Sequence, residues 1–176
     1  MLTLFEDFIE RIRFDYFAKI PERSELEIIG NELKAICSKF IFDENVYRLA
    51  RSGEELMYEL CVDPNGGASI YLVSDGAGVD TVPHDHQTWA VIVGISGAES
   101  NVFYKPSDED RVAIRIGERC IREGDVLAME AHEIHAIDSS LGIHPTYHVH
   151  LYGRSLASLP SFISRCYTDG RGNTFE

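Results

Sequence analysis

The sequence predicts a mainly β protein: a β-barrel or sandwich with a small helical layer at its N-terminus. Helical patterns are confined to the first third of the 176-residue chain. From about residue 56, short runs rich in β-branched and aromatic residues alternate with turns of glycine, proline, asparagine and aspartate. No helical pattern alternates with these runs, which disfavours a parallel α/β sheet and favours an all-β sandwich or barrel.

Two helices are expected before the first strand. Residues 3–19 repeat apolar side chains at the spacing of one helical face, carried by Leu4, Phe5, Phe8, Ile9 and Ile12. A second helix follows Pro21, with Ser24 as its N-cap and Glu27 as the capping-box partner. Its apolar stripe comprises Leu26, Ile29, Leu33 and Ile36. A shorter helical piece is expected near residues 44–52.

The strand-like runs then follow one another to the end of the chain. In order they read MYELCVD, ASIYLVS, TWAVIVGI, AESNVFYKP, RVAIRI, DVLAME, IHAID and PTYHVHLYG, with turns such as PNGG, DGAG and SG between them. We therefore expect one domain, with residues 1–55 as helices packed on the barrel, 56–168 as the barrel and 169–176 as a tail.

Charge and composition exclude several classes of function. The net charge is −13, from 16 basic and 29 acidic residues, and this disfavours nucleic acid or an anionic membrane as partners. The chain has no apolar stretch of transmembrane length, and its N-terminus does not read as a signal peptide. The four cysteines form no CxxC pair, so we expect reduced thiols in a cytoplasmic protein.

The distribution of the histidines indicates where a metal-binding or catalytic site lies in the chain. All seven lie between His84 and His150, and the first 83 residues have none. His84 and His86 flank Asp85 where an extended segment enters the strongest strand. Because alternate side chains of an extended segment share a face, the two imidazoles are expected to project together into the barrel, as a metal ion requires.

Two further clusters strengthen this interpretation. His135 lies in a predicted strand, after the expected turn residue His132. His148, His150 and Tyr152 alternate along the last strand and are expected to share one face. Imidazoles are costly to bury together without a ligand or an ion. A metal centre therefore accounts for three histidine-bearing segments in one small β domain.

Two segments resemble the motifs of a known family. PHDHQTWAVIVGISGAE resembles the first cupin motif, and GDVLAMEAHEIHAID resembles the second. Within the cupins, residues 56–167 are most similar to the thiol dioxygenases, such as cysteine dioxygenase and 3-mercaptopropionate dioxygenase. The resemblance implies a cupin double-stranded β-helix, or jelly-roll barrel. It also implies one Fe(II) per chain on three metal ligands, His84, His86 and His135.

The resemblance extends to residues beside the metal. Tyr152 and His150 match a His-x-Tyr pair whose histidine lies fifteen residues after the third ligand, and His148 stands where the family has a serine. These three residues are the implied catalytic group. Most cupins also have a glutamate ligand four or five residues after the His-x-His pair. Here those positions are Ala90 and Val91, and the thiol dioxygenases likewise use three histidines without a carboxylate.

The residue that binds the substrate carboxylate stays open. Mammalian members of the family place an arginine in an early strand, where the nearest match here is Tyr58. The bacterial mercaptopropionate type uses an arginine after the His-x-Tyr pair. The candidates at that place are Arg165 and, second, Arg154.

The implied activity is oxidation of a small thiol by O₂ to its sulfinate. The partners are then a small-molecule thiol and O₂, and the chain is expected to be a monomer or a homodimer. Two alternatives remain open. One is another three-histidine cupin dioxygenase, for example a β-diketone-cleaving enzyme, and the other is a non-enzymatic metal-binding cupin. Three histidines also accept nickel, manganese or zinc.

Overall fold

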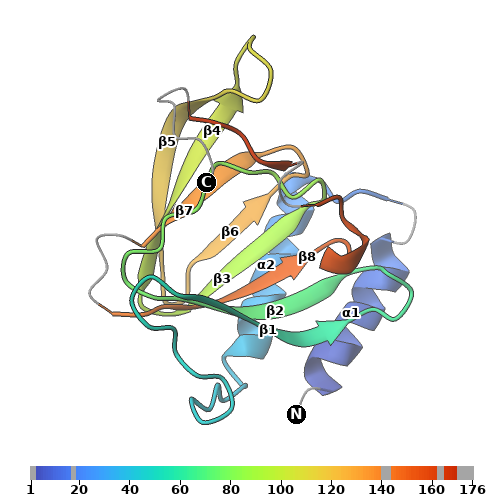
Figure 1. The fold of residues 1–176 in the computed structure, drawn as a ribbon. Coiled ribbons are helices and arrows are strands. Elements are labelled where there is room, and N and C mark those ends of the chain that lie inside the picture. The colour runs from blue at the N-terminus through green and yellow to red at the C-terminus, as the bar shows by residue number, and fades with distance from the viewer. Residues whose placement is uncertain (1–2, 17–18, 140–143, 162–164, 170–176) are drawn as a thin grey trace.

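Figure 1 shows two helices at the N-terminal end of a mainly β chain. This computed structural model describes residues 3–16, 19–139, 144–161 and 165–169. The helices are α1 (Thr3–Tyr16) and α2 (Arg23–Cys37). The described strands are β1 (Glu55–Val62), β2 (Ser69–Asp75), β3 (Ala90–Ser96), β4 (Ala98–Pro106), β5 (Ala113–Arg122), β6 (Val126–Met129), β7 (Ile134–Asp138) and β8 (Tyr147–Tyr152). A short 3₁₀ helix, η1 (Leu156–Ser158), follows β8.

The strands form two antiparallel sheets. The larger sheet has the order β1-β2-β8-β3-β6, and the smaller has the order β5-β4-β7. The segment that precedes β3 joins the smaller sheet through bridges from Asp80 to Asp138 and from His84 to His135. It therefore adds a fourth, irregular strand beside β7.

This strand order is that of a jelly roll. The chain passes between the two sheets, so that β8 returns to lie between β2 and β3, and β7 lies between β4 and the segment before β3. Two such interlocked sheets form the double-stranded β-helix architecture that cupins use. The predicted fold class, a mainly β cupin barrel with an N-terminal helical layer, is confirmed.

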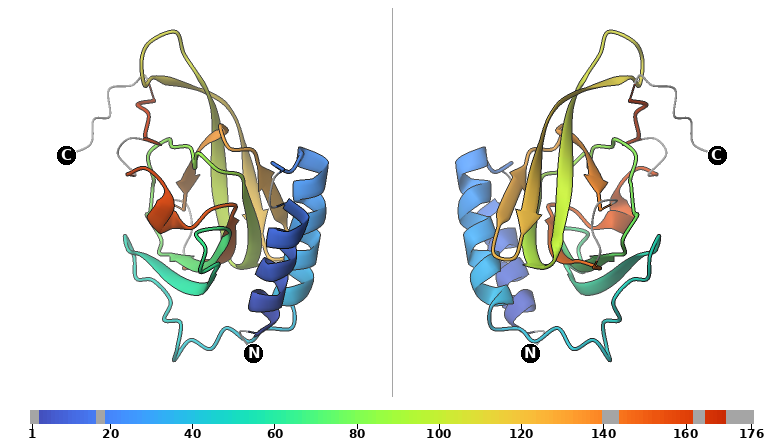
Figure 2. Two further views of the ribbon diagram at one scale, coloured as in Figure 1. Left: turned by 90° about the vertical axis from the view of Figure 1, so that its right-hand side faces the viewer. Right: turned by 90° about the vertical axis from the view of Figure 1, so that its left-hand side faces the viewer.

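The helices cover one face of the larger sheet, as both views in Figure 2 show. Their apolar stripes pack against the side of that sheet that faces away from the barrel interior. Leu26, Leu33 and Phe5 are fully buried there, together with Val149 and Leu151 of β8. A second cluster fills the inside of the barrel and includes Ile92, Met129 and Tyr152. β8 is therefore buried on both faces.

Two local predictions about helices are wrong. α2 begins after Glu22, not after Ser24, because Glu22 and Glu25 form a reciprocal capping box in which the Glu25 carboxylate accepts the Glu22 backbone N–H at 2.8 Å.

The piece near residues 44–52 is not helical. Its start is a turn in which the Asp43 carboxylate accepts the Asn45 backbone N–H at 2.9 Å, and this local bond competes with a helix.

Some expectations fall at the edges of the described ranges. The first helix was expected to reach residue 19, but it ends at Tyr16, and residues 17–18 lie outside the described residues. Residues 170–176 of the predicted tail also lie outside them. In the described ranges, no helix has the length and the apolar run that a bilayer span requires. All four cysteines are described, and none is in a disulfide.

Gly30 lets α2 approach the larger sheet closely. A Cβ at this position would lie 2.4 Å from Val126 Cγ1 and 2.9 Å from Val91 Cγ1, both well inside contact distance. A helix interior normally gains roughly 0.5–1 kcal/mol from a glycine-to-alanine change. Here the steric clash outweighs that gain, because both contacting methyl groups belong to short, β-branched side chains.

We expect Gly30→Ala to lower the free energy of unfolding by roughly 1–3 kcal/mol, the usual cost of overpacking a core. Chemical denaturation measures it. The double variant Gly30→Ala with Val126→Ala removes the nearest methyl groups and should recover stability relative to the sum of the single changes. A stabilised Gly30→Ala protein would contradict this packing of α2.

Candidate metal centre

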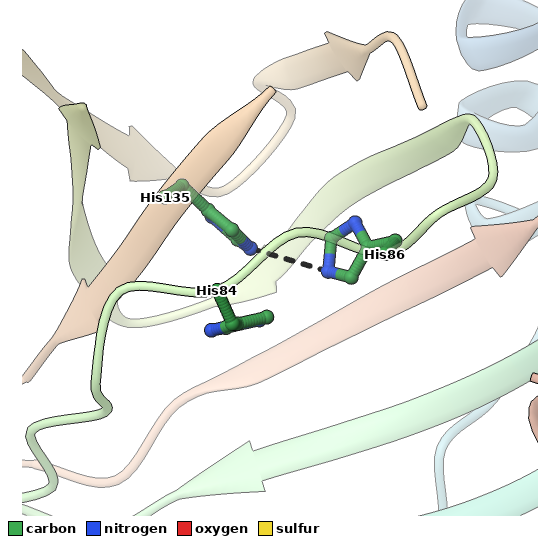
Figure 3. A group of neighbouring side chains, drawn as sticks. All are labelled: His84, His86 and His135. Carbon is green, nitrogen blue, oxygen red and sulfur yellow. Dashed lines mark hydrogen bonds between the residues drawn. The ribbon is translucent and has the colours of Figure 1, made fainter. Parts of the chain in front are cut away.

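Three histidines converge inside the barrel, and each comes from a segment whose backbone is fixed. His84 and His135 form a backbone pair across the sheet, with N–H···O bonds of 2.8 and 2.9 Å in the two directions. Side chains of directly opposed residues lie on the same face, so the pairing brings both rings to one place. His86 follows two residues after His84 and points to the same space, as Figure 3 shows.

The ring nitrogens are arranged as metal ligands. One ligating nitrogen from each ring lies within 4.8 Å of the other two, and all three rings are buried. His135 Nε2 lies 3.2 Å from His86 Nε2. Two imidazole nitrogens bound at about 2.1 Å to one ion, at roughly right angles, have about this separation. The geometry of the predicted ligand set therefore fits a metal ion.

The outer nitrogens of two rings are held by backbone and side-chain acceptors. His84 Nδ1 lies 2.9 Å from the Val82 carbonyl oxygen, and His135 Nδ1 lies 2.9 Å from Asn101 Oδ1. An oxygen acceptor at Nδ1 places the ring proton there and leaves Nε2 as a lone pair. Both rings therefore present their unprotonated nitrogen to the centre.

Electrostatics keeps the three rings neutral. Burial lowers the pKa of His84, and burial followed by repulsion from neighbouring imidazoles holds the pKa values of His86 and His135 well below the ordinary range. A metal ion binds the neutral imidazole, so a low pKa means that protons do not compete for the site. The barrel supplies three neutral donors without a carboxylate among them.

Tyr152 and His150 stand beside the three histidines. The Tyr152 ring lies edge-on to His86, with ring centroids 5.1 Å apart, and its hydroxyl lies 3.0 Å from His150 Nδ1. Burial raises the pKa of Tyr152 above its ordinary range and lowers the pKa of His150 to about 4. At neutral pH the tyrosine therefore keeps its proton and the histidine is uncharged.

A cavity of about 260 Å³ opens onto this centre. Besides the histidines and Tyr152, its wall contains apolar side chains, namely Met57, Val73, Ile137 and Leu156. It also contains one residue of each charge, Glu55 and Arg165. A larger hollow of about 460 Å³ lies elsewhere, against β4 and β5, but its described lining has no histidine or cysteine. The smaller cavity is therefore the candidate site.

Of the two predicted arginines, the structure brings Arg165 to the cavity. Its Nη1 donates to the Asp85 carbonyl at 2.8 Å and its Nε donates to the Pro160 carbonyl at 3.1 Å, which fixes the guanidinium. Arg154 lies elsewhere: it is exposed and lines a separate hollow with Trp89. Tyr58 also lies away from the cavity, since its hydroxyl donates to the Arg48 carbonyl.

His148 shares the inward face of β8 with His150 but does not line the cavity. Its Nδ1 lies 3.0 Å from Glu99 Oε2, and both side chains are completely buried. Neither atom has a well-aligned hydrogen bond among the described residues. The structure thus places His148 behind the centre rather than in it.

Three buried polar residues around this contact were not predicted from the sequence: Asp75 of β2, and Glu99 and Asn101 of β4. The signal for the last two was present in the run AESNVFYKP. With a period of two, Glu99 and Asn101 share a face with Phe103, so two polar residues lie on an inward face. Polar side chains are buried there only when they have partners.

No protein-family model and no curated protein matches the sequence. Solved structures that are similar include a cupin superfamily protein from Desulfitobacterium hafniense DCB-2 (19% identity, covering 60% of this chain and 83% of that one, TM-score 0.46). A second is a protein with a double-stranded β-helix domain from Klebsiella pneumoniae subsp. pneumoniae MGH 78578 (16% identity, covering 68% of this chain and 94% of that one, TM-score 0.48). A third is a DMSP lyase from Ruegeria pomeroyi DSS-3 (16% identity, covering 63% of this chain and 52% of that one, TM-score 0.48). At these identities and TM-scores the likenesses carry no argument about activity, and the fold rests on the strand order.

The geometry predicts that the three histidines act together in binding metal. We expect the 176-residue chain, loaded anaerobically with Fe²⁺, to retain one metal ion per chain after desalting. His86→Ala or His135→Ala should abolish retention, because two imidazoles remain. Elemental analysis checks this, with His132→Ala as the matched control, since His132 is an exposed turn residue. Equal metal content in all four proteins would contradict the site.

A second prediction concerns Asp75, which is completely buried. Burial, followed by the charges of Glu99 and Glu55, raises its pKa to about 8. In the unfolded chain its pKa is about 3.9, so the folded state binds the extra proton between these values. The contribution of a neutral, buried Asp75 to stability is thus fully present below about pH 4 and is lost as the pH rises toward 8.

Asp75→Asn keeps the side chain neutral at every pH. We expect its stability advantage over the natural protein to grow by up to about 1.4 kcal/mol per pH unit between pH 5 and 8. Urea unfolding at a series of pH values measures the difference. Asp7→Asn removes the same charge from an exposed position of α1. The difference between its free energy of unfolding and that of the natural protein should therefore stay constant over this pH range. A pH-independent difference for Asp75→Asn would contradict the prediction.

Proposed function

We propose that this protein is an iron-dependent thiol dioxygenase that converts a small thiol and O₂ to the sulfinate. The reaction is R–SH + O₂ → R–SO₂H, so both oxygen atoms end on sulfur and no further reductant is needed. The observation that carries the proposal is a set of three neutral, buried imidazoles without a carboxylate, in one cavity with the Tyr152–His150 pair.

His84, His86 and His135 would hold the metal. A ferrous ion on three neutral ligands keeps its full charge, and when bound it supplies the redox chemistry and the attraction for a thiolate. The chain contributes the surroundings. Apolar walls at Val73 and Ile137 limit access of water to the reacting sulfur. The volume suits a small molecule, since drug-sized ligands occupy larger cavities, from about 300 Å³.

Tyr152 is the proposed hydrogen-bond donor in this cavity. Its raised pKa keeps the phenol protonated at neutral pH. In this scheme His150 carries its ring proton on Nδ1 and donates it to the Tyr152 oxygen at 3.0 Å, which leaves the single phenol proton for the substrate. The tyrosine would orient a polar atom of the bound substrate or oxidant through its O–H. His150 acts through the tyrosine and is a positioning residue in this scheme.

Arg165 is the proposed anchor for a substrate carboxylate. The carbonyls of Asp85 and Pro160 hold its guanidinium at the cavity wall, so an incoming carboxylate meets a fixed positive group. Glu55 lies in the same wall and would repel that carboxylate but attract a substrate ammonium group. A thiol that carries both groups, as cysteine does, satisfies both charges.

The apolar part of the wall favours a second candidate function. Met57, Val73, Ile137 and Leu156 would suit an apolar substrate, such as a β-diketone cleaved by a three-histidine dioxygenase. Such an enzyme needs neither Tyr152 nor Arg165 for substrate binding. The two candidates therefore differ in what these two residues do to turnover.

The test is O₂ uptake by the Fe²⁺-loaded protein with cysteine, 3-mercaptopropionate, cysteamine and acetylacetone, with products identified by mass spectrometry. We expect uptake with at least one thiol and a product 32 mass units heavier, as the addition of O₂ requires. Tyr152→Phe should lower kcat by 10- to 1,000-fold, the range for loss of one placed hydrogen-bond donor or acid. Arg165→Gln should raise KM for thiols with a carboxylate and leave cysteamine unaffected.

Three outcomes would redirect the proposal. Uptake with acetylacetone that survives Tyr152→Phe would favour the β-diketone alternative. Full iron loading without O₂ uptake on any thiol would contradict thiol dioxygenation and leave a metal-binding protein. Arg154→Gln is the matched control for Arg165→Gln, because it removes the same charge from an exposed position outside the cavity. Equal effects of the two changes would contradict the role of Arg165.

A further inference from the structure

We propose that Asn101 and Glu99 are positioning residues for the metal ligand His135: Glu99 sets the orientation of the Asn101 amide, and the amide oxygen sets which ring nitrogen of His135 carries the proton. This inference rests on the three-histidine site of the proposed function but not on the identity of the substrate. Neither Glu99 nor Asn101 lines the cavity, so the proposed reaction by itself gives these two buried residues no role.

The first link is the contact between His135 and Asn101. His135 Nδ1 lies 2.9 Å from Asn101 Oδ1, and both side chains are completely buried. An amide oxygen only accepts hydrogen bonds, so Nδ1 must carry the proton and donate it. A neutral imidazole has one ring proton, and Nε2 is therefore left as the lone pair that faces His86 Nε2 at 3.2 Å. This is the tautomer that a metal at Nε2 requires.

The second link decides which end of the amide faces His135. Asn101 Nδ2 donates to Glu99 Oε1 at 3.2 Å. If the amide were turned by 180°, its oxygen would face the carboxylate oxygen, and its N–H group would face Nδ1 of His135. That ring would then have to carry its proton on Nε2, and it could not bind the metal there. A carboxylate only accepts hydrogen bonds, so an ionised Glu99 selects the productive orientation.

The third link keeps Glu99 ionised. Burial alone would raise the pKa of a carboxyl that is fully enclosed, but the neighbouring His148 imidazole and the hydrogen bond from the Asn101 amide lower the pKa of Glu99 below its ordinary value. His148 Nδ1 lies 3.0 Å from Glu99 Oε2. Three strands thus share one polar chain: His148 of β8, Glu99 and Asn101 of β4, and His135 of β7.

The strand register explains why this chain of contacts forms. Asn101 is opposite Ile137 of β7, and Phe103 is opposite His135. Asn101 therefore lies diagonally across from His135 on the inward face, a separation that side chains of this length can bridge. Glu99 is the next inward residue of the same strand. Residues two apart on β4 thus place a carboxylate, an amide and an imidazole in sequence.

The first test compares Asn101→Leu with Asn101→Asp. Leucine has a similar size but no acceptor. In Asn101→Asp the aspartate oxygen that faces Glu99 shares one proton with it, because two carboxylates this close cannot both ionise, and the other oxygen still accepts the proton of His135 Nδ1. We expect Asn101→Leu to weaken Zn²⁺ binding by 10- to 100-fold, the range for loss of a group that orients a ligand. Asn101→Asp should bind within a few-fold of the natural protein. Chelator competition gives the affinities, with Val102→Ala as control, because Val102 is buried on the same strand but points to the other face.

The second test is a double-mutant cycle, which separates orientation from general packing. Glu99→Met should lower Zn²⁺ affinity when residue 101 is asparagine, since the amide loses the group that orients it. The same change in the Asn101→Asp background should lower Zn²⁺ affinity no further. Both oxygens of the aspartate carboxylate accept hydrogen bonds, so either orientation of the side chain serves His135. Equal losses in both backgrounds would overturn the proposal and make Glu99 a packing residue.

The third measurement reads the tautomer directly and needs no metal. Long-range ¹H–¹⁵N spectra of the full chain report the protonated nitrogen of His135, which His135→Gln identifies by loss of its signals. We expect the proton on Nδ1 in the natural protein and in Asn101→Asp, and a shift toward Nε2 in Asn101→Leu. Retention of the Nδ1 tautomer in a folded Asn101→Leu protein would overturn the proposal. Absence of thiol oxidation would leave these outcomes unchanged.

Discussion

Enclosing three neutral imidazoles at one point inside the barrel determines how the surrounding strands and side chains must be arranged. Imidazole prefers water, and a buried ring must satisfy two nitrogens. For His84 and His135, an oxygen acceptor takes the outer nitrogen, and the inner nitrogen of each faces the centre. The same burial lowers the pKa values of His86 and His135, so these rings stay unprotonated, and a metal ion binds the unprotonated imidazole.

The jelly roll meets this constraint through its backbone pairing. The segment before β3 is irregular, yet His84 exchanges two backbone hydrogen bonds with His135, which fixes their rings on one face. Gly97 makes the tight connection from β3 to β4 possible, because its φ of +75° suits glycine and a Cβ there would lie 3.0 Å from Thr146 Cγ2. β4 then pairs with β7 so that Phe103 is opposite His135, and this register places Asn101 within reach of His135.

The sequence predicted what depends on periodicity and local order. Two helices, the β texture and the convergence of His84 with His86 follow from spacing, and the cupin resemblance implied His135 as the third ligand; the structure contains both helices and brings the three histidines together. It did not predict what depends on long-range register. Glu99 and Asn101 read as an ordinary strand run, and their role emerges only when β4 lies beside β7. The N-cap at Glu22 was missed for a different reason, since serine is the commoner cap and a reciprocal pair of glutamates carries no strong signal.

The distribution of charge narrows what the cavity is suited to bind. A chain of net charge −13 repels a small anion at long range, but salt screens that field beyond about 10 Å. Inside this distance the cavity wall presents Arg165 and Glu55, one charge of each sign, beside three uncharged imidazoles. A bound divalent cation would make the local charge positive. Attraction for an anionic group would therefore arise only inside the cavity, from Arg165 and a bound cation, while Glu55 in the same wall would attract a positive group of the substrate.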